Sequence, residues 1–191
     1  LILVALYGTE AYAAYGIGVQ ILSFSIVIGF GFSIAGATLV GQHLGADDQN
    51  QAKRAGWGAM RLSIISMTFF GILITLFAET LSRFMIDNDE VVRLSVIFIW
   101  LLGSVQPLMA IEFSLGGALR GAGDTKTPLV ITLTCLLFVR VLLALIFYFL
   151  NASIEIIFST LVADYVVKGF LYIARFRSNR WMNSIKFKGD H

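Results

Sequence analysis

The chain has 191 residues, of which 58% are hydrophobic and 14% are charged, and its mean hydropathy is +0.84. Soluble domains contain about 25% charged residues, so this composition indicates a membrane protein. The net charge of +2 gives no basic footprint for nucleic acid, and a single cysteine, Cys135, excludes a disulfide within the chain.

Residues 1–7 are predicted to be the end of a truncated helix, because they carry neither an initiator methionine nor the basic start and cleavage site of a signal peptide. A first membrane span is predicted over about residues 9–43, with Thr9 as a possible N-cap. It exceeds the roughly 20 residues that cross about 30 Å of hydrocarbon.

Small residues recur every fourth position in the second half of this span, at Ser33, Ala37, Gly41 and Gly45. Such a stripe lets another helix approach closely, so it predicts a helix-packing seam. A substrate path along the same stripe is the alternative interpretation.

The second span is predicted over about residues 50–79, capped by Asp47 or Asp48. Its first turns, QNQAKRAGWGAM, are polar, and we expect them at the water interface with Trp57 as an anchor.

A third span is predicted over about residues 90–119, capped by Asn88 or Asp89 and kinked at Pro107, which removes one backbone hydrogen bond.

The fourth span is predicted over residues 128–150, with Thr127 as its N-cap and Pro128 in its first turn. The fifth is predicted over residues 154–176. Residues 178–191 then form a basic tail, so that residues 1–177 make up the bundle.

These spans predict an all-α polytopic transmembrane bundle, since the apolar runs are too long for barrel strands and lack period-two alternation. Lysine and arginine gather in alternate loops and in the tail. By the positive-inside rule, these loops and the C-terminus are expected to be cytoplasmic. The basic residues are Lys53, Arg54, Arg120, Lys126, Arg175, Arg177, Arg180, Lys186 and Lys188.

Buried charge inside a membrane is costly, so the ionisable residues that we expect deep in the bundle are candidates for function: Glu112, Arg140, Asp164 and Lys168. They could be ion pairs that hold the bundle together, Asp164 with Lys168 at i+4 and Glu112 with Arg140. Alternatively, one carboxylate exchanges a proton or Na⁺. Glu112 is the first candidate because no cation lies within one turn of it in the sequence, and Asp164 is the second.

Gln20, Gln106 and Tyr165 are polar groups at membrane depth, which could line a cavity or form hydrogen bonds between helices. No HExxH, CxxC or P-loop motif is present, and no serine, histidine and acid occur at one depth. We therefore expect neither an enzyme nor a bound cofactor.

Two stretches, ATLVGQHLGADDQNQAKRAGW (37–57) and LGGALRGAGDTKTPL (115–129), resemble the paired cytoplasmic turns in the second half of multidrug and toxic compound extrusion (MATE) transporters. The stretch AYAAYGIGVQI, Arg140, and the pair Arg180 and Trp181 add to this resemblance. The residues assigned to these hinge turns are Gly41, Gln42, Gly45, Arg120, Gly121, Gly123, Asp124 and Pro128.

The resemblance implies two six-helix lobes around a cavity that opens alternately to either side. The chain would supply the end of helix seven and helices eight to twelve, and would not be active alone. Its expected partners are the N-terminal lobe, membrane lipids and small amphipathic or cationic substrates, with no nucleic acid. Such proteins lie in the plasma (inner) membrane and expel organic cations by antiport with Na⁺ or H⁺.

Two features depart from the family pattern. The stretch FVRVLLALIF lacks the proline that many members have after the arginine, which puts a bend there in doubt, and the stretch of helix seven that carries an acid is absent. Two alternatives remain open: a flippase for lipid-linked oligosaccharide or peptidoglycan precursors from the same superfamily, and a non-transporting membrane scaffold. A flippase needs several cations facing its cavity, whereas the deep charges here are two acids and two bases.

Overall fold

The computed structural model describes residues 9–150 and 154–183, and every element in that part of the chain is helical, as predicted. The elements are α2 (Thr9–Gly45), α3 (Gln49–Leu76), α4 (Ala78–Met85), α5 (Asp89–Gly121), α6 (Lys126–Thr134), the π-helix η1 (Cys135–Val141), α7 (Leu142–Phe149), α8 (Ile154–Arg177) and the 3₁₀ helix η2 (Arg180–Asn183).

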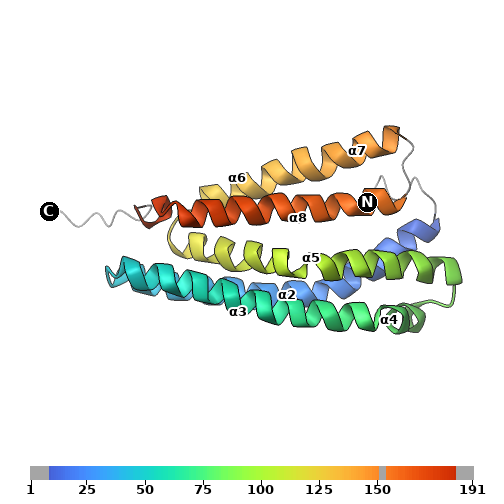
Figure 1. Cartoon of the computed structure of the whole chain (residues 1–191), viewed down its shortest axis with the longest axis horizontal. Coiled ribbons are helices and arrows are strands. Elements are labelled where there is room, and N and C mark those ends of the chain that lie inside the picture. The colour runs from blue at the N-terminus through green and yellow to red at the C-terminus, as the bar shows by residue number, and fades with distance from the viewer. Residues whose placement is uncertain (1–8, 151–153, 184–191) are drawn as a thin grey trace.

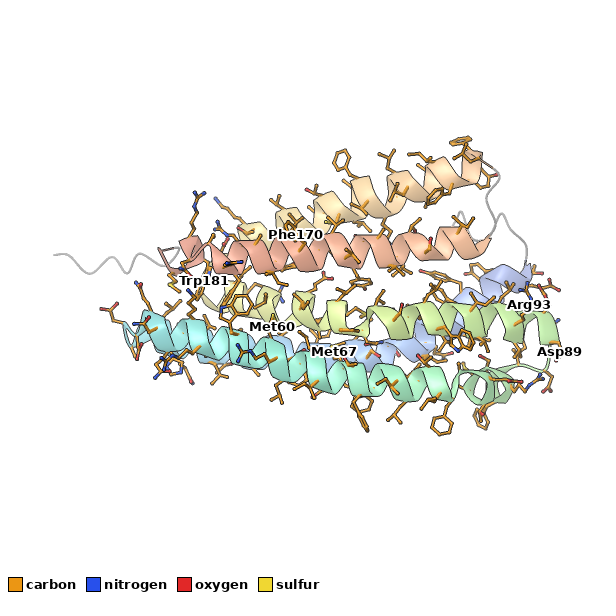
Figure 2. All side chains as sticks on the ribbon, viewed as in Figure 1. Met60, Met67, Asp89, Arg93, Phe170 and Trp181 are labelled. Atoms are coloured by element: carbon orange, nitrogen blue, oxygen red, sulfur yellow. The ribbon has the colours of Figure 1, made fainter. Side chains whose placement is uncertain are left out.

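The long helices run side by side along one axis (Figure 1), and α5 lies among them, in contact with α2, α3 and α8. The turns at residues 46–48 and 122–125 lie at the same end as the C-terminal end of α8, which we call the basic end. The helix α4 lies at the opposite end. Figure 2 likewise shows Asp89 and Arg93 at the end opposite Trp181. This up-and-down order agrees with the loop alternation expected from the charges.

Four helical segments of the described chain are long and apolar enough to cross a membrane: Tyr12–Gly45, Gln49–Leu76, Asp89–Gly121 and Lys126–Phe149. The last comprises α6, η1 and α7 in succession. The fifth predicted span corresponds to α8, which packs against α5 and η1. That α8 also crosses the membrane stays a prediction.

The helix caps are partly as predicted. Asp48 caps α3 by accepting a hydrogen bond from the amide of Gln51, and Asn88 caps α5 by accepting from two amides. The predicted Thr127 cap is wrong: α6 begins at Lys126, and the side chain of Asp124 accepts hydrogen bonds from the amide and hydroxyl of Thr127. Asp124 can take this place because it precedes the helix and its carboxylate accepts two bonds at once.

The second predicted span, about residues 50–79, extends past the end of α3, which stops at Leu76 and is followed by the short helix α4. Phe77 is the junction, with φ −100° and ψ 14°. On α4, Phe84 is 92% exposed while Ala78 and Ser82 are buried. This two-faced character is typical of a helix that lies along a membrane surface.

The predicted packing seam on α2 is confirmed, and α5 is its partner. A β-carbon added at Gly117 would lie 2.1 Å from the carbonyl oxygen of Ser33, and one added at Gly121 would lie 2.1 Å from that of Ala37. The two backbones therefore touch directly. Gly45, the last member of the stripe, has nothing within 4 Å of its β-position and does not take part.

The fourth span changes its helical form in the middle. Residues Cys135–Val141 are a π-helix, so backbone bonding shifts there from four to five residues, and Arg140 lies within this segment. Such segments bend helices without a proline. Pro107, by contrast, lies inside a helix that runs from Asp89 to Gly121 without interruption. The kink at Pro107 stays a prediction.

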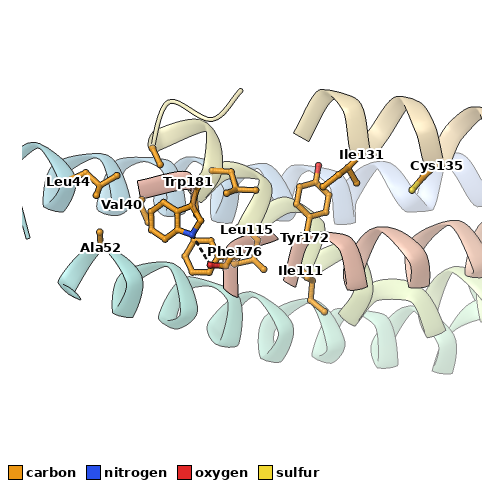
Figure 3. Packing of buried hydrophobic residues seen from close by; sticks show 13 residues of the cluster. Val40, Leu44, Ala52, Ile111, Leu115, Ile131, Cys135, Tyr172, Phe176 and Trp181 are labelled. Atoms are coloured by element: carbon orange, nitrogen blue, oxygen red, sulfur yellow. Dashed lines mark hydrogen bonds between the residues drawn. The ribbon is translucent and has the colours of Figure 1, made fainter. Parts of the chain in front are cut away.

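An aromatic cluster closes the basic end. Trp181, fully buried, stacks on Phe176 with 4.5 Å between ring centroids and donates a 2.8 Å hydrogen bond from Nε1 to the Phe176 carbonyl. Trp57 meets Phe176 edge-on, and Figure 3 shows Trp181 beside Val40 of α2. The start of the predicted tail is therefore part of the bundle's core, whereas residues 184–191 lie outside the described residues.

Candidate functional site

Three ionisable side chains meet between α5 and α8. Lys168 Nζ lies 3.0 Å from Asp164 Oδ2 and 3.7 Å from Glu112 Oε1. The side chain of Asp164 has no exposed area, that of Lys168 is 7% exposed and that of Glu112 is 19% exposed. We call Glu112, Asp164 and Lys168 the charge triad.

Two features of the sequence build the triad. Asp164 and Lys168 are one helical turn apart on α8, so their side chains share a face. That face turns toward α5 because small residues allow close contact: the β-position of Gly116 lies 3.4 Å from the ring of Tyr172, and that of Gly169 lies 3.6 Å from Leu108. The 3.0 Å distance between Lys168 Nζ and Asp164 Oδ2 confirms the predicted ion pair between these residues.

The triad carries two carboxylates against one ammonium. Lys168 also lies 5.1 Å from the centroid of the Tyr165 ring, close enough for a cation–π contact. Both carboxylate oxygens of Asp164 are buried without a hydrogen-bond donor among the described residues, and only the ion-pair contact with Lys168 reaches Oδ2. A buried carboxylate normally accepts several hydrogen bonds, so Asp164 has unused acceptor capacity.

The predicted pairing of Glu112 with Arg140 is wrong, because Lys168 is the cation that reaches Glu112. No ion pair of Arg140 occurs in the part of the chain that the structure describes, and its side chain is half-buried on η1. No cation lies within one turn of Glu112 in the sequence, but the fold brings Lys168, more than 50 residues away, close to it.

The three polar candidates have different surroundings. Gln106 is buried on α5 and donates a 2.8 Å hydrogen bond from Nε2 to Ser25 Oγ on α2, so it joins helices. Its Oε1 has no donor in the described region. Gln20 is exposed on α2, and Tyr165 is half-buried beside Lys168. Sequence reasoning missed Ser25, since a serine in an apolar helix is not distinctive.

The turn at residues 122–125 is held by a second charged contact. Asp124 accepts hydrogen bonds from Arg175 Nε at 2.9 Å and Nη2 at 2.6 Å, which ties the turn to the end of α8. Although burial alone would raise the pKa of Asp124, the bonds from Arg175 and Thr127 bring this pKa below its ordinary value. Sequence reasoning missed Arg175 as the partner, because the two residues lie 51 positions apart.

The remaining turn residues serve packing more than chemistry. Gly123 adopts φ 78°, a conformation that favours glycine. Arg120, exposed at the end of α5, donates a hydrogen bond to Ser33 Oγ, and Gly41 lies close to the Gly121 carbonyl. Pro128 is buried and Gln42 is exposed.

The triad lies apart from a shallow groove of about 350 Å³ between α3 and α5. Gly71, Gly103 and Pro107 are among its lining residues, together with hydroxyl groups of Thr68, Thr75 and Ser104. None of the deep charged residues lines this groove.

Similarity to known proteins agrees with this architecture. The MatE family model matches residues 1–165. The probable multidrug resistance protein NorM of Thermotoga maritima is 30% identical over 178 residues, which cover 91% of this chain and 38% of that protein. A protein of the same name from Mesorhizobium japonicum is 30% identical over 134 residues, 68% of this chain and 29% of its own length.

A solved structure supports the fold. It is a MOP superfamily transporter from Pyrococcus furiosus, described as having a binding pocket of reverse polarity that suggests a different function, and it aligns with a TM-score of 0.75 at 18% identity. The match covers 98% of this chain and 40% of the other chain, so our sequence spans about two fifths of such proteins. With a family model covering most of its length, this multi-pass membrane chain belongs to the MatE family, that of the MATE transporters.

Proposed function

We propose that the chain forms the second lobe of a secondary active transporter that expels organic cations and other amphipathic compounds by antiport with Na⁺ or H⁺. The observation that carries this proposal is the charge triad buried between α5 and α8. Membership of a transporter family also agrees with the expectation that the protein is not an enzyme. The activity would belong to the whole transporter, with its N-terminal lobe.

Buried charge argues for ion exchange. Ionisable groups inside membrane helices are costly, and where they occur they commonly mark an ion or proton pathway. Here the structure buries two carboxylates beside one lysine, which leaves the triad with a net negative charge when all three groups are ionised. Such a site attracts a monovalent cation.

Glu112 is our candidate for the group that exchanges the ion, with Asp164 second. The Glu112 side chain is 19% exposed, whereas that of Asp164 is inaccessible, which favours Glu112 as the first carboxylate that an ion would contact. It is also the more weakly held carboxylate, since its distance from Lys168 is 3.7 Å against 3.0 Å for Asp164. A coupling ion can drive transport only if it binds one conformation of the lobes more tightly than the other.

Orientation follows from the same charge pattern. We place the basic end, with the turns at residues 46–48 and 122–125, on the cytoplasmic face of the plasma membrane. The C-terminus would then also be cytoplasmic. Lys53, Arg54 and Lys126 near these turns support this placement by the positive-inside rule.

The flippase alternative is less well supported. Binding a pyrophosphate-linked lipid needs cations that are free to face the cavity. Lys168, however, is held against two carboxylates, so its charge is already neutralised. Arg140 alone among the deep basic residues is left for such a role in the described chain.

Transport by the full-length protein in proteoliposomes tests the proposal. Efflux of a fluorescent organic cation should require a Na⁺ or H⁺ gradient, and collapsing each gradient separately identifies the ion. Glu112→Gln should abolish gradient-driven efflux. Glu90→Gln, at an exposed position in the first turn of α5, should retain it, because this turn lies at the end of the bundle away from the basic end. Gradient-independent efflux would contradict antiport, and full activity of Glu112→Gln would contradict the role of Glu112.

A further inference from the structure

We propose that the charge triad as a whole, and not Glu112 alone, is the cation site: it binds one monovalent cation because it has one carboxylate more than it has lysines, and Lys168 is the tethered cation with which the ion competes. This inference rests on the proposed antiport function. It assigns Asp164 a share in ion binding equal to that of Glu112, although Asp164 is fully buried.

The geometry shows why the three groups act together. Lys168 Nζ lies within ion-pair distance of both carboxylates, so any cation near Glu112 also meets the lysine's charge. Lys168 Nζ lies 3.0 Å from Asp164 Oδ2 but 3.7 Å from Glu112 Oε1, so its contact with Asp164 is the closer one. A cation arriving at Glu112 can therefore displace the weaker contact while Lys168 keeps the stronger one.

Asp164 supplies an independent observation. Its side chain is completely buried, yet neither carboxylate oxygen receives a hydrogen bond in the part of the chain that the structure describes. Most buried polar atoms in proteins are satisfied by a partner, and an unsatisfied ionised group is especially costly. Lys168 is the group that offsets this charge, so removing either carboxylate that it contacts, Glu112 or Asp164, alters the same balance.

Other charged and titratable groups stand further off. Arg120 lies toward the basic end of α5 and is hydrogen-bonded to Ser33, while Arg140 lies on η1. Neither forms an ion pair with a triad carboxylate among the described residues, although both act on the region at longer range. The phenols of Tyr165 and Tyr172 and the thiol of Cys135 are the neighbouring titratable groups without a charge at neutral pH. The close charge balance is therefore set by three side chains.

This charge balance makes an unusual prediction. Glu112→Gln leaves Asp164 and Lys168, which neutralise each other, so cation binding should be lost. Asp164→Asn leaves Glu112 and Lys168, which also neutralise each other, so binding should be lost although Glu112 is intact. The double substitution Asp164→Asn with Lys168→Met restores one surplus carboxylate, and binding should return.

The experiment uses the purified full-length protein in detergent. Its melting temperature is measured against Na⁺ at constant ionic strength with choline, and separately against pH without Na⁺, which distinguishes the two possible cations. A neighbouring opposite charge typically changes a carboxylate's affinity for a proton by about tenfold or more. We expect Glu112→Gln and Asp164→Asn each to weaken cation binding by at least about tenfold, and the double variant to recover it.

Each outcome is informative. If the wild-type protein responds to neither cation, the proposed antiport fails together with this inference. If wild type responds, Glu112→Gln does not, and Asp164→Asn binds like wild type, only this inference is overturned. A folded double variant that does not regain binding also overturns it. Should the double variant fail to fold, Lys168→Met alone must bind the cation more tightly than wild type, and unchanged affinity overturns the inference.

Discussion

Replacing Gly117 by alanine should weaken the packing of α2 against α5. The added β-carbon would lie 2.1 Å from the Ser33 carbonyl oxygen and 2.7 Å from its carbonyl carbon and α-carbon. Ordinary contacts between such atoms need about 3.5 Å, so the helices must separate by roughly 1 Å. Both clashing groups are backbone, so no side-chain rotation relieves the contact.

The magnitude follows from two opposing effects. Overpacking a well-filled interior costs about 1–3 kcal/mol, and alanine gains about 1 kcal/mol over glycine in a helix. Because the Gly117 contact is between backbones, we expect the upper part of this range and a net loss of about 2 kcal/mol in the free energy of unfolding. Unfolding of the full-length protein in detergent, followed by circular dichroism, measures this loss.

Gly31→Ala is the matched control, since it adds the same methyl group on α2 where nothing lies within 4 Å. It should leave stability unchanged or raise it by up to about 1 kcal/mol. Equal stability of Gly117→Ala and Gly31→Ala would refute the reasoning, because the close approach of α2 and α5 would then carry no energetic weight.

Three further substitutions test other contacts. Asp124→Asn should cost about 2 kcal/mol at neutral pH by weakening the contact with Arg175; since the fold lowers the pKa of Asp124, this difference should shrink as the pH falls below the ordinary value of 3.8. Trp181→Ala should cost about 3–5 kcal/mol in thermal unfolding, because it leaves a large cavity at the basic end. Ser25→Ala should cost about 1–3 kcal/mol by leaving Gln106 Nε2 unpaired, and adding Gln106→Leu should restore most of that loss.

Each of these has its own check. For Asp124→Asn, a stability difference that stays constant from pH 7 to pH 3 would contradict the charged contact. Trp100→Ala is the control for Trp181→Ala, since Trp100 is 58% exposed, and similar losses for the two would contradict the buried cluster. For Gln106, a double variant as unstable as Ser25→Ala would show that the hydrogen bond is not the cause.

The positions of most helices were predictable because helix length and apolar composition are local in sequence. Length and apolar composition placed the ends of the third and fifth predicted spans within two residues of the ends of α5 and α8. The caps at Asp48 and Asn88 were predictable for the same reason, since each acts on amides two or three positions away. Where α3 ends was not, because no glycine or proline marks the junction at Phe77.

Contacts between helices were predictable only in part. The small-residue stripe indicated that another helix approaches α2, but it could not identify α5 as that helix, because complementarity is visible only when both faces are known. The link between Asp124 and Arg175 gave no local pattern at all. The π-helix around Arg140 was equally hidden, since backbone bonding there departs from the period that helix predictions assume.

The triad shows how buried charge can specify the arrangement of membrane helices. Apolar faces of α8 would pack against α5 nearly equally well in several rotations, because lipid and protein interiors are similarly apolar. Turning α8 by one residue, about 100°, would carry Lys168 and Asp164 away from Glu112 and toward lipid. An ionised group there costs at least about 2.5 kcal/mol, so the charges select one rotation that hydrophobicity alone leaves open. The same three side chains would then fix the rotation of α8 and provide the ion's binding site. A single neutral substitution disturbs both roles, so the double substitution Asp164→Asn with Lys168→Met is needed to separate them.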